Sequence, residues 1–121
     1  MNILVDTNIA LYLFGGDQQI SGVLDGQVVH ASFVTELELL GYPGITIEEE
    51  KLIHHFLDDC VVIDLNGQIK SKTIKLRRQY GLKLPDSIIA ATACYLGIPL
   101  FSADMDFRAV KEIDLMAYER S

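Results

Sequence analysis

The sequence predicts an α/β fold in which helices cover both faces of a mainly parallel sheet of four or five strands. Short runs rich in valine and isoleucine alternate along the chain with longer segments of helical periodicity. Recognisable capping residues mark the ends of several of these helical segments. Such alternation is typical of parallel sheets, because parallel neighbours need a crossover connection between them.

Four segments have the short apolar pattern of a buried strand, and a fifth is a weaker candidate. The four are residues 2–5, 27–31, 60–63 and 99–102, and the fifth is 115–118. Among the helical segments, Thr46 and Glu49 form the pattern of a capping box. Helical spacing continues from position 69 to 80, and Gly81 is placed to end that helix. Pro85 and Gly97 then bound an apolar helix that belongs in the core.

Length and composition favour one globular domain spanning residues 1–121, since the chain is 50% hydrophobic and 22% charged. The N-terminus lacks a basic segment followed by an apolar stretch, and no apolar run approaches the roughly 20 residues of a membrane span. We therefore expect a cytoplasmic protein without a membrane segment. The cysteines and histidines lack the spacing of zinc ligands, and Cys60 and Cys94 are expected to be free thiols.

The formal net charge of −7 argues against a protein that coats nucleic acid through bulk electrostatics, although it does not exclude a nuclease. The basic residues are unevenly placed along this acidic chain. Six of the ten fall in one segment, the basic strip, which consists of Lys70, Lys72, Lys75, Arg77, Arg78 and Lys83. A solvated helix face is the simpler explanation of the strip, and a contact surface for a polyanion is the functional one.

Two aspartates stand where a parallel sheet collects its ligands, just beyond the carboxyl ends of strands. Asp6 follows the first predicted strand, and Asp104 follows the fourth. Asp86 lies in the first turn of the apolar helix that begins at Pro85. Helix capping explains Asp6 and Asp86 equally well, because the free backbone amides at a helix start stabilise a carboxylate.

Glu38 lies within an apolar patch of a predicted helix, where a carboxylate must find a partner or lose its charge. Glu36 competes for the same place, and position alone does not choose between them. Carboxylates gathered in a cleft of low dielectric constant repel one another unless they share a cation. Mg²⁺ or Mn²⁺ is the natural cation for an oxygen-only site, and such a site favours phosphodiester hydrolysis.

Four short motifs follow one another along the chain. They are residues 5–8 (Val-Asp-Thr-Asn), 32–40 (Ser-x-x-Thr-x-x-Glu-Leu-Leu), 85–93 (Pro-Asp-Ser-Ile-Ile-Ala-Ala-Thr-Ala) and 102–107 (Ser-Ala-Asp-Met-Asp-Phe). In this order they resemble the motifs of the PIN-domain family, and of VapC-type toxins in particular. Each motif is short, but together they cover almost the whole chain in the order of the family. The resemblance implies a three-layer α/β/α sandwich and an endoribonuclease that depends on Mg²⁺ or Mn²⁺.

Site residues can be carried over from this resemblance position by position, which favours Glu38 over Glu36. The implied catalytic centre consists of Asp6, Glu38, Asp86 and Asp104. The implied metal ligands are Asp6, Asp86, Asp104 and Asp106. Hydrogen bonds that support the site are implied for Asn8, Ser32 and Thr35.

The same resemblance implies three partners, which are an RNA substrate, a small antitoxin whose tail occupies the active-site groove, and a second copy in a homodimer. The chain would then act as the toxin component of a type II toxin–antitoxin pair. The basic strip offers a contact surface for RNA phosphates or for an acidic part of the antitoxin, through Lys75, Arg77 and Arg78.

Two rival functions remain open at this point. One is a catalytically inactive binding module of the same fold. The other is an aspartate-based phosphatase, since Asp6 follows a first strand. That chemistry would need a second acidic residue two positions later, where the chain has Asn8.

Overall fold

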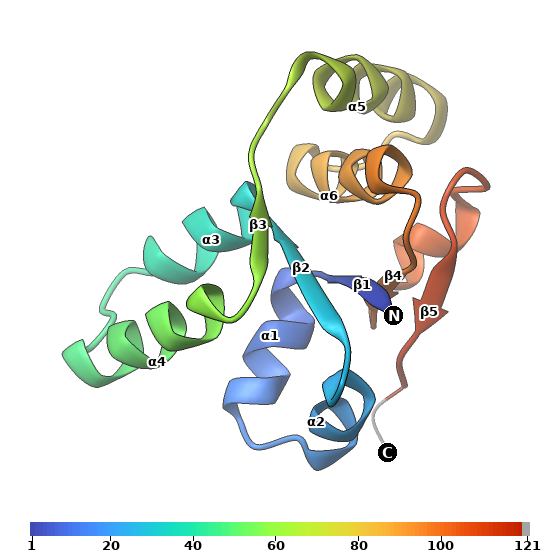
Figure 1. The fold of residues 1–121 in the computed structure, drawn as a ribbon. Coiled ribbons are helices and arrows are strands. Elements are labelled where there is room, and N and C mark those ends of the chain that lie inside the picture. The colour runs from blue at the N-terminus through green and yellow to red at the C-terminus, as the bar shows by residue number, and fades with distance from the viewer. Residues whose placement is uncertain (120–121) are drawn as a thin grey trace.

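The computed structural model describes residues 1–119, which form a five-stranded sheet with helices on both sides of it (Figure 1). In chain order the elements are β1 (Asn2–Val5), α1 (Thr7–Phe14), α2 (Gln18–Leu24), β2 (Val28–Ser32), α3 (Phe33–Leu40), α4 (Ile47–Asp58), β3 (Val61–Ile63), α5 (Gly67–Tyr80), α6 (Leu84–Leu96), β4 (Leu100–Ser102), the 3-10 helix η1 (Met105–Ala109) and β5 (Leu115–Ala117). None of the helices in this part of the chain combines the length and apolar character needed to cross a membrane.

The sheet has the strand order β3-β2-β1-β4-β5, and every neighbouring pair is parallel. All five predicted strands are present, and each end lies within one residue of its predicted position. The predicted α/β fold class is therefore confirmed. The chain builds outward from β1 through β2 to β3, and it then returns to the other side of β1 to add β4 and β5. The direction of winding thus reverses between β1 and β4.

Alternating side chains of β1 divide the core into two layers. Leu4 joins a cluster with Ile89 of α6 and Leu76 of α5. Ile3 and Val5 point to the opposite face, where they join a cluster with residues of α1 and α2. In Figure 1 the α5–α6 pair accordingly lies above the sheet, and α1 and α2 lie below it. A third cluster joins α1 to α3 and α4, so that these three helices are packed against one another.

The predicted helix ends are confirmed by backbone geometry. Thr46 and Glu49 form both hydrogen bonds of a capping box at the start of α4, each 3.1 Å long. Gly81 and Gly97 end α5 and α6 with φ angles of 67° and 66°, a left-handed conformation that glycine adopts without a steric penalty. Only residues 81–83 connect α5 to α6, so the end of α5 lies beside the start of α6.

Candidate active site

The reversal of winding between β1 and β4 opens a crevice at the carboxyl edge of the sheet, the usual ligand site of such folds. Asp6 directly follows β1, and Asp104 comes two residues after the end of β4. Since β1 and β4 are hydrogen-bonded neighbours, these two aspartates come from positions far apart in sequence to the same edge. The geometry predicted from strand ends is therefore present in the structure.

Asp6 is almost completely buried, with 4% of its surface exposed. One carboxylate oxygen accepts a hydrogen bond of 2.9 Å from the amide of Ile9, so Asp6 does cap α1. The other oxygen accepts a short hydrogen bond from the hydroxyl of Ser102. Burial raises the pKa of Asp6, the two hydrogen bonds oppose this rise, and the negative charges of Asp104 and Glu38 add to it.

Ser102 connects Asp6 to the segment that follows β4. Its hydroxyl donates to Asp6 and accepts a hydrogen bond of 2.9 Å from the backbone amide of Asp104. The carboxylate of Asp104 in turn accepts a hydrogen bond of 2.9 Å from the amide of Asp106. Sequence reasoning did not select Ser102 as a site residue. A hydroxyl at a strand end, two residues before an aspartate, was the available signal.

Asp86, Asp104 and Asp106 form a group in which one carboxylate oxygen from each residue lies within 4.8 Å of the others. Asp86 and Asp104 are half-buried, whereas Asp106 is exposed. Burial, together with the negative charges of Asp104 and Asp6, raises the pKa of Asp86 to about 6, although the charge of Lys83 lowers it. Closely spaced carboxylates such as these repel one another, and a hard divalent cation would relieve that repulsion.

Glu38 is exposed rather than enclosed by the apolar residues next to it in sequence. The face of α3 that carries it borders the crevice rather than the core, which is why a carboxylate is tolerated there. Its partner is Thr7, whose hydroxyl donates a hydrogen bond of 2.7 Å to the carboxylate. The Thr7 hydroxyl also lies 3.1 Å from that of the fully buried Thr35. Glu36 is half-buried and does not line the crevice.

These side chains surround a cleft of about 260 Å³, which we call the acidic cleft. Its lining residues are Asp6, Thr7, Asn8, Leu11, Glu38, Tyr42, Asp86, Ile89 and Asp104. Of the supporting residues implied by the resemblance, Asn8 lines the cleft and Thr35 reaches it through Thr7. Ser32 is buried, and its hydroxyl caps α3 by accepting a hydrogen bond of 3.1 Å from the amide of Val34.

A second hollow, the apolar groove, lies beside the acidic cleft and has a volume of about 450 Å³. It runs between α1, α3 and α4, and its lining includes Leu39, Leu52 and Ile53. The groove and the cleft share Thr7, Leu11, Glu38 and Tyr42. The groove and the cleft therefore adjoin each other.

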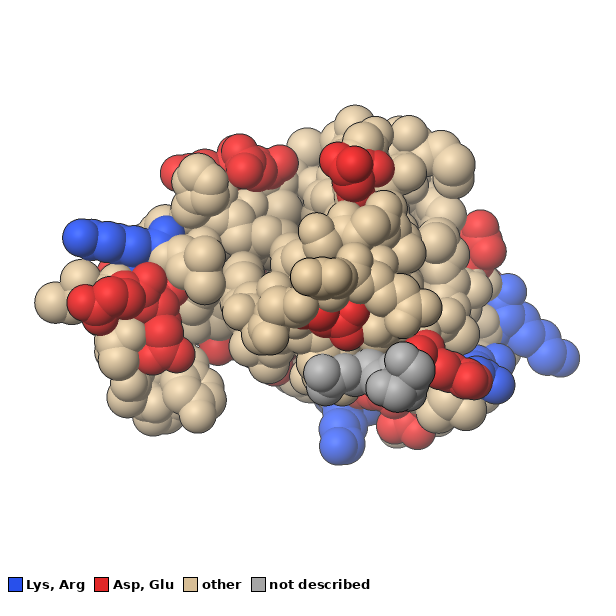
Figure 2. All heavy atoms as spheres, turned by 90° about the horizontal axis from the view of Figure 1, so that it is seen from below, with Lys and Arg blue, Asp and Glu red and all other residues tan. Residues whose placement is uncertain are grey.

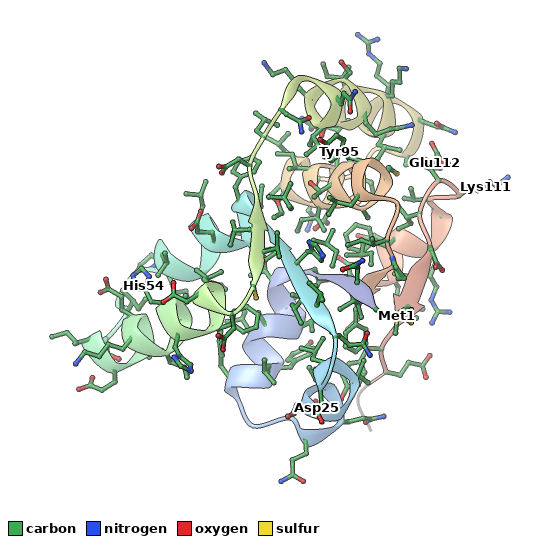
Figure 3. The ribbon with its side chains drawn as sticks, viewed as in Figure 1. Met1, Asp25, His54, Tyr95, Lys111 and Glu112 are labelled. Carbon is green, nitrogen blue, oxygen red and sulfur yellow. The ribbon has the colours of Figure 1, made fainter. Side chains whose placement is uncertain are left out.

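The basic strip lies on α5 and on the connection to α6. Lys75, Arg77 and Arg78 are exposed, and none of them forms an ion pair within residues 1–119. In Figure 3 long nitrogen-tipped side chains project from α5 away from the sheet. Figure 2, which views the molecule from the side opposite α5, shows several groups of acidic side chains with basic ones only at the margins. Positive charge is thus concentrated near α5.

Comparisons with known proteins agree with this architecture. A model of the PIN domain matches residues 3–113. A toxin–antitoxin complex from Klebsiella pneumoniae is 28% identical, with a TM-score of 0.82 over 98% of this chain and 99% of that chain. VapBC2 from Rickettsia felis, bound to a promoter DNA fragment, has a TM-score of 0.88 at 16% identity, covering 98% of this chain and 100% of that one. VapBC-1 from nontypeable Haemophilus influenzae has a TM-score of 0.78 at 24% identity, covering 97% and 98%. No curated protein matches the sequence.

A parallel sheet with an oxygen-rich acidic cleft at its carboxyl edge defines a class of α/β proteins suited to cation-assisted chemistry. Within that class, the chain belongs to the PIN-domain family, because the match to the family spans residues 3–113 of 121. The resemblance carried by the four sequence motifs is confirmed. Membership assigns the chain to a family of nucleases.

Replacing Asp86 with asparagine should reduce the pH dependence of stability in the metal-free protein. The pKa of Asp86 is about 6 in the folded chain, above its ordinary value of 3.8, so the folded state binds this proton more tightly than the unfolded state. The free energy of unfolding should therefore fall as the pH rises from about 4 to about 6, by on the order of 1 kcal/mol after allowance for partial exposure. Thermal unfolding in the presence of chelator, carried out at pH values below and above this range, measures this loss of stability.

The control is Asp25→Asn, which removes an exposed carboxylate at the end of α2. This variant should show the same fall in the free energy of unfolding with rising pH as the wild type. In Asp86→Asn a smaller fall should remain, because Asp6 also has a raised pKa. Equal pH dependence in wild type and Asp86→Asn would contradict the assigned environment of Asp86.

Proposed function

We propose that the chain is a Mg²⁺- or Mn²⁺-dependent endoribonuclease that hydrolyses RNA phosphodiester bonds. The observation that carries this proposal is the convergence of carboxylates from distant segments on one cleft, whose lining contains no cysteine or histidine. Asp86, Asp104 and Asp106 would hold the ion, since hard divalent cations prefer carboxylate oxygens. Membership of the PIN-domain family supports nuclease chemistry in this cleft.

The carboxylates of the cleft would have different roles in the reaction. A bound divalent ion supplies positive charge for the phosphodiester and activates water for attack. Asp6 would present a fixed charge at the floor of the cleft, because Ile9 and Ser102 hold both of its oxygens. Glu38 is exposed and held by Thr7 at the rim of the cleft, where it would accept the proton of the attacking water.

The experiment that tests this function is cleavage of RNA with Mg²⁺, with Mn²⁺ and with chelator. Wild type should cleave with either ion and lose activity in chelator. Asp6→Asn, Asp86→Asn and Asp104→Asn should each lower kcat by roughly a hundredfold or more, because each removes charge from the site that stabilises the transition state. Asp25→Asn is the matched control, since it removes a carboxylate outside the cleft, and it should retain full activity.

Four outcomes would each refute the assignment in a different way. Cleavage that persists in chelator would exclude a metal-dependent reaction. Full activity in the three cleft variants would place the chemistry elsewhere. Absence of cleavage with every ion and substrate, combined with intact RNA binding, would favour the alternative of an inactive binding module. Release of phosphate from a monoester without RNA cleavage would instead favour the aspartate-based phosphatase.

We also propose that the chain is a VapC-type toxin of a type II toxin–antitoxin pair. The Klebsiella pneumoniae structure, which is a toxin–antitoxin complex, is 28% identical over nearly the whole chain and supports this role. The antitoxin would dock a helix in the apolar groove, where Leu39, Leu52 and Ile53 offer apolar contacts. Its tail would continue into the acidic cleft, because the two hollows share Thr7 and Glu38. A cytoplasmic location would accord with an RNA target.

A homodimer is a further part of this proposal, carried from the family resemblance. Large apolar side chains outside the two hollows, such as Leu37, Leu65 and Leu84, are about half exposed or more and are available for such an interface. Sedimentation of the purified protein should give the mass of two chains of 13.5 kDa. A single-chain mass over the whole accessible concentration range would contradict the dimer.

RNA is the partner that we assign to the basic strip, through Lys75, Arg77 and Arg78. Arg77 and Arg78 lie in the last turn of α5, and the short connection brings that end of the helix beside the start of α6, where Asp86 lies. Their charges are unpaired within the described residues, so they can form charge-assisted hydrogen bonds with phosphates. An RNA strand that leaves the acidic cleft could therefore reach Arg77 and Arg78.

The double variant Arg77→Gln/Arg78→Gln should bind single-stranded RNA more weakly than wild type. Loss of two phosphate contacts should reduce the slope of log affinity against log salt by about 1.4. The control outside the basic strip is Lys51→Gln on α4, and its slope should be that of wild type. An unchanged slope in the arginine variant would refute the RNA contact, and weaker binding to polyglutamate alone would assign the strip to an acidic protein.

A further inference from the structure

Tyr42 presents an aromatic ring at the rim of the acidic cleft. Its surface is 63% exposed, and its side chain forms no hydrogen bond or ring contact within residues 1–119. Phe101 and Tyr118, in contrast, pack edge to face in the core. Leu11 lies at the same rim and is 49% exposed. Two large side chains with apolar surface therefore face solvent beside a cleft whose charged residues are all acidic.

The backbone around Tyr42 fixes where its ring is presented. Gly41 ends α3 by donating a hydrogen bond of 2.8 Å to the carbonyl of Leu37. A Cβ atom on Gly41 would lie only 2.6 Å from that carbonyl oxygen, so this turn requires glycine. Pro43 restricts the backbone on the other side of Tyr42, and the Tyr42 carbonyl accepts a hydrogen bond of 3.2 Å from Ile45. The Tyr42 ring therefore lies one helical turn beyond Glu38, on a backbone segment whose conformation is restricted.

The acidic cleft itself provides little attraction for RNA. Its charged residues are carboxylates, which repel phosphates until a cation intervenes, and the whole chain carries a net charge of −7. Contacts that do not depend on charge are therefore needed near the scissile phosphate. Stacking of bases on aromatic rings is such a contact, and it contributes roughly 1–3 kcal/mol per base in proteins that bind single strands.

We propose that Tyr42 and Leu11 form a nucleobase subsite, in which the base next to the scissile phosphate stacks on the Tyr42 ring. The proposal rests on the proposed ribonuclease function and deepens it. Because every base has a π face, the subsite would accept different bases, and it would favour single-stranded RNA over paired RNA. Tyr42 acts as a positioning residue, since stacking places the neighbouring phosphate over the carboxylates of Asp86 and Asp104.

A protein helix in the apolar groove is the other occupant that could cover Tyr42, since the ring borders both hollows. Two features favour the base. The ring lines the same cleft as the carboxylates, and its exposed aromatic surface is flat and unpaired, as a stacking contact requires. The groove keeps an apolar lining of Leu39, Leu52 and Ile53 without Tyr42.

The test compares Tyr42→Leu and Tyr42→Phe on a single-stranded RNA whose cleavage position has been mapped. Tyr42→Leu keeps an apolar side chain but loses the aromatic face, so KM should rise about tenfold or more with little change in kcat. Tyr42→Phe keeps the ring and should behave as wild type. The matched control is Tyr95→Leu, because Tyr95 is 46% exposed but lies on α6 outside the cleft (Figure 3).

Substrates with an abasic residue on either side of the cleavage position separate stacking from other effects of the substitution. Removing the stacked base should raise KM for wild type by a similar factor, and Tyr42→Leu should then add no further loss. A substrate with 2-aminopurine at that position supplies a readout independent of cleavage. Its fluorescence should be quenched on binding to wild type and to Tyr42→Phe, but not on binding to Tyr42→Leu.

Several results would overturn the proposal while leaving the ribonuclease function intact. Metal-dependent cleavage with the same KM in wild type and Tyr42→Leu would leave the ring as the end wall of the apolar groove, available to a protein helix. An equal loss on intact and abasic substrates would show that the ring does not contact a base. Failure of wild type to cleave any RNA would instead refute the proposed function.

Discussion

Repulsion among carboxylates is the constraint on which the arrangement of this molecule's cleft depends. Burial and the neighbouring charges raise the pKa of Asp6 and of Asp86, so gathering these groups destabilises the metal-free chain. The sheet offsets this cost, because β1 and β4 lie at its centre and bury Leu4, Val5 and Leu100 completely. Asp6, Asp86 and Asp104 lie just beyond strand ends or at a helix start, at the border of that core.

Hydroxyl groups hold the carboxylates in place without adding charge. Ser102 donates to Asp6 and accepts from the amide of Asp104, so a single side chain positions two of them. Thr7 likewise donates a hydrogen bond to Glu38, and the hydroxyl oxygen of Thr7 lies 3.1 Å from that of Thr35. A hydroxyl suits this task because it donates and accepts at once, and it leaves the remaining carboxylate lone pairs directed at the cleft.

Local patterns were sufficient to predict the fold. Valine- and isoleucine-rich runs located the strands within one residue, and glycines in the left-handed conformation ended α5 and α6 as expected. Strand-end reasoning also found Asp6 and Asp104, whereas choosing Glu38 over Glu36 needed the family pattern. Thr7, Ser102 and Tyr42 were not selected. Their roles depend on partners brought close by folding: 31 residues separate Thr7 from Glu38, and 96 separate Ser102 from Asp6.

An acidic protein that acts on RNA must separate the groups that bind its substrate from those that cut it. Here the face opposite α5 carries several groups of acidic side chains (Figure 2), whereas the exposed Lys75, Arg77 and Arg78 on α5 form no ion pair within residues 1–119. Under the proposed function, long-range attraction would be weak, and recognition would rest on short-range contacts with a few nucleotides. The same acidic cleft would attract a basic peptide strongly. An inhibitor that combines an apolar helix with a basic tail would therefore compete with RNA for both hollows.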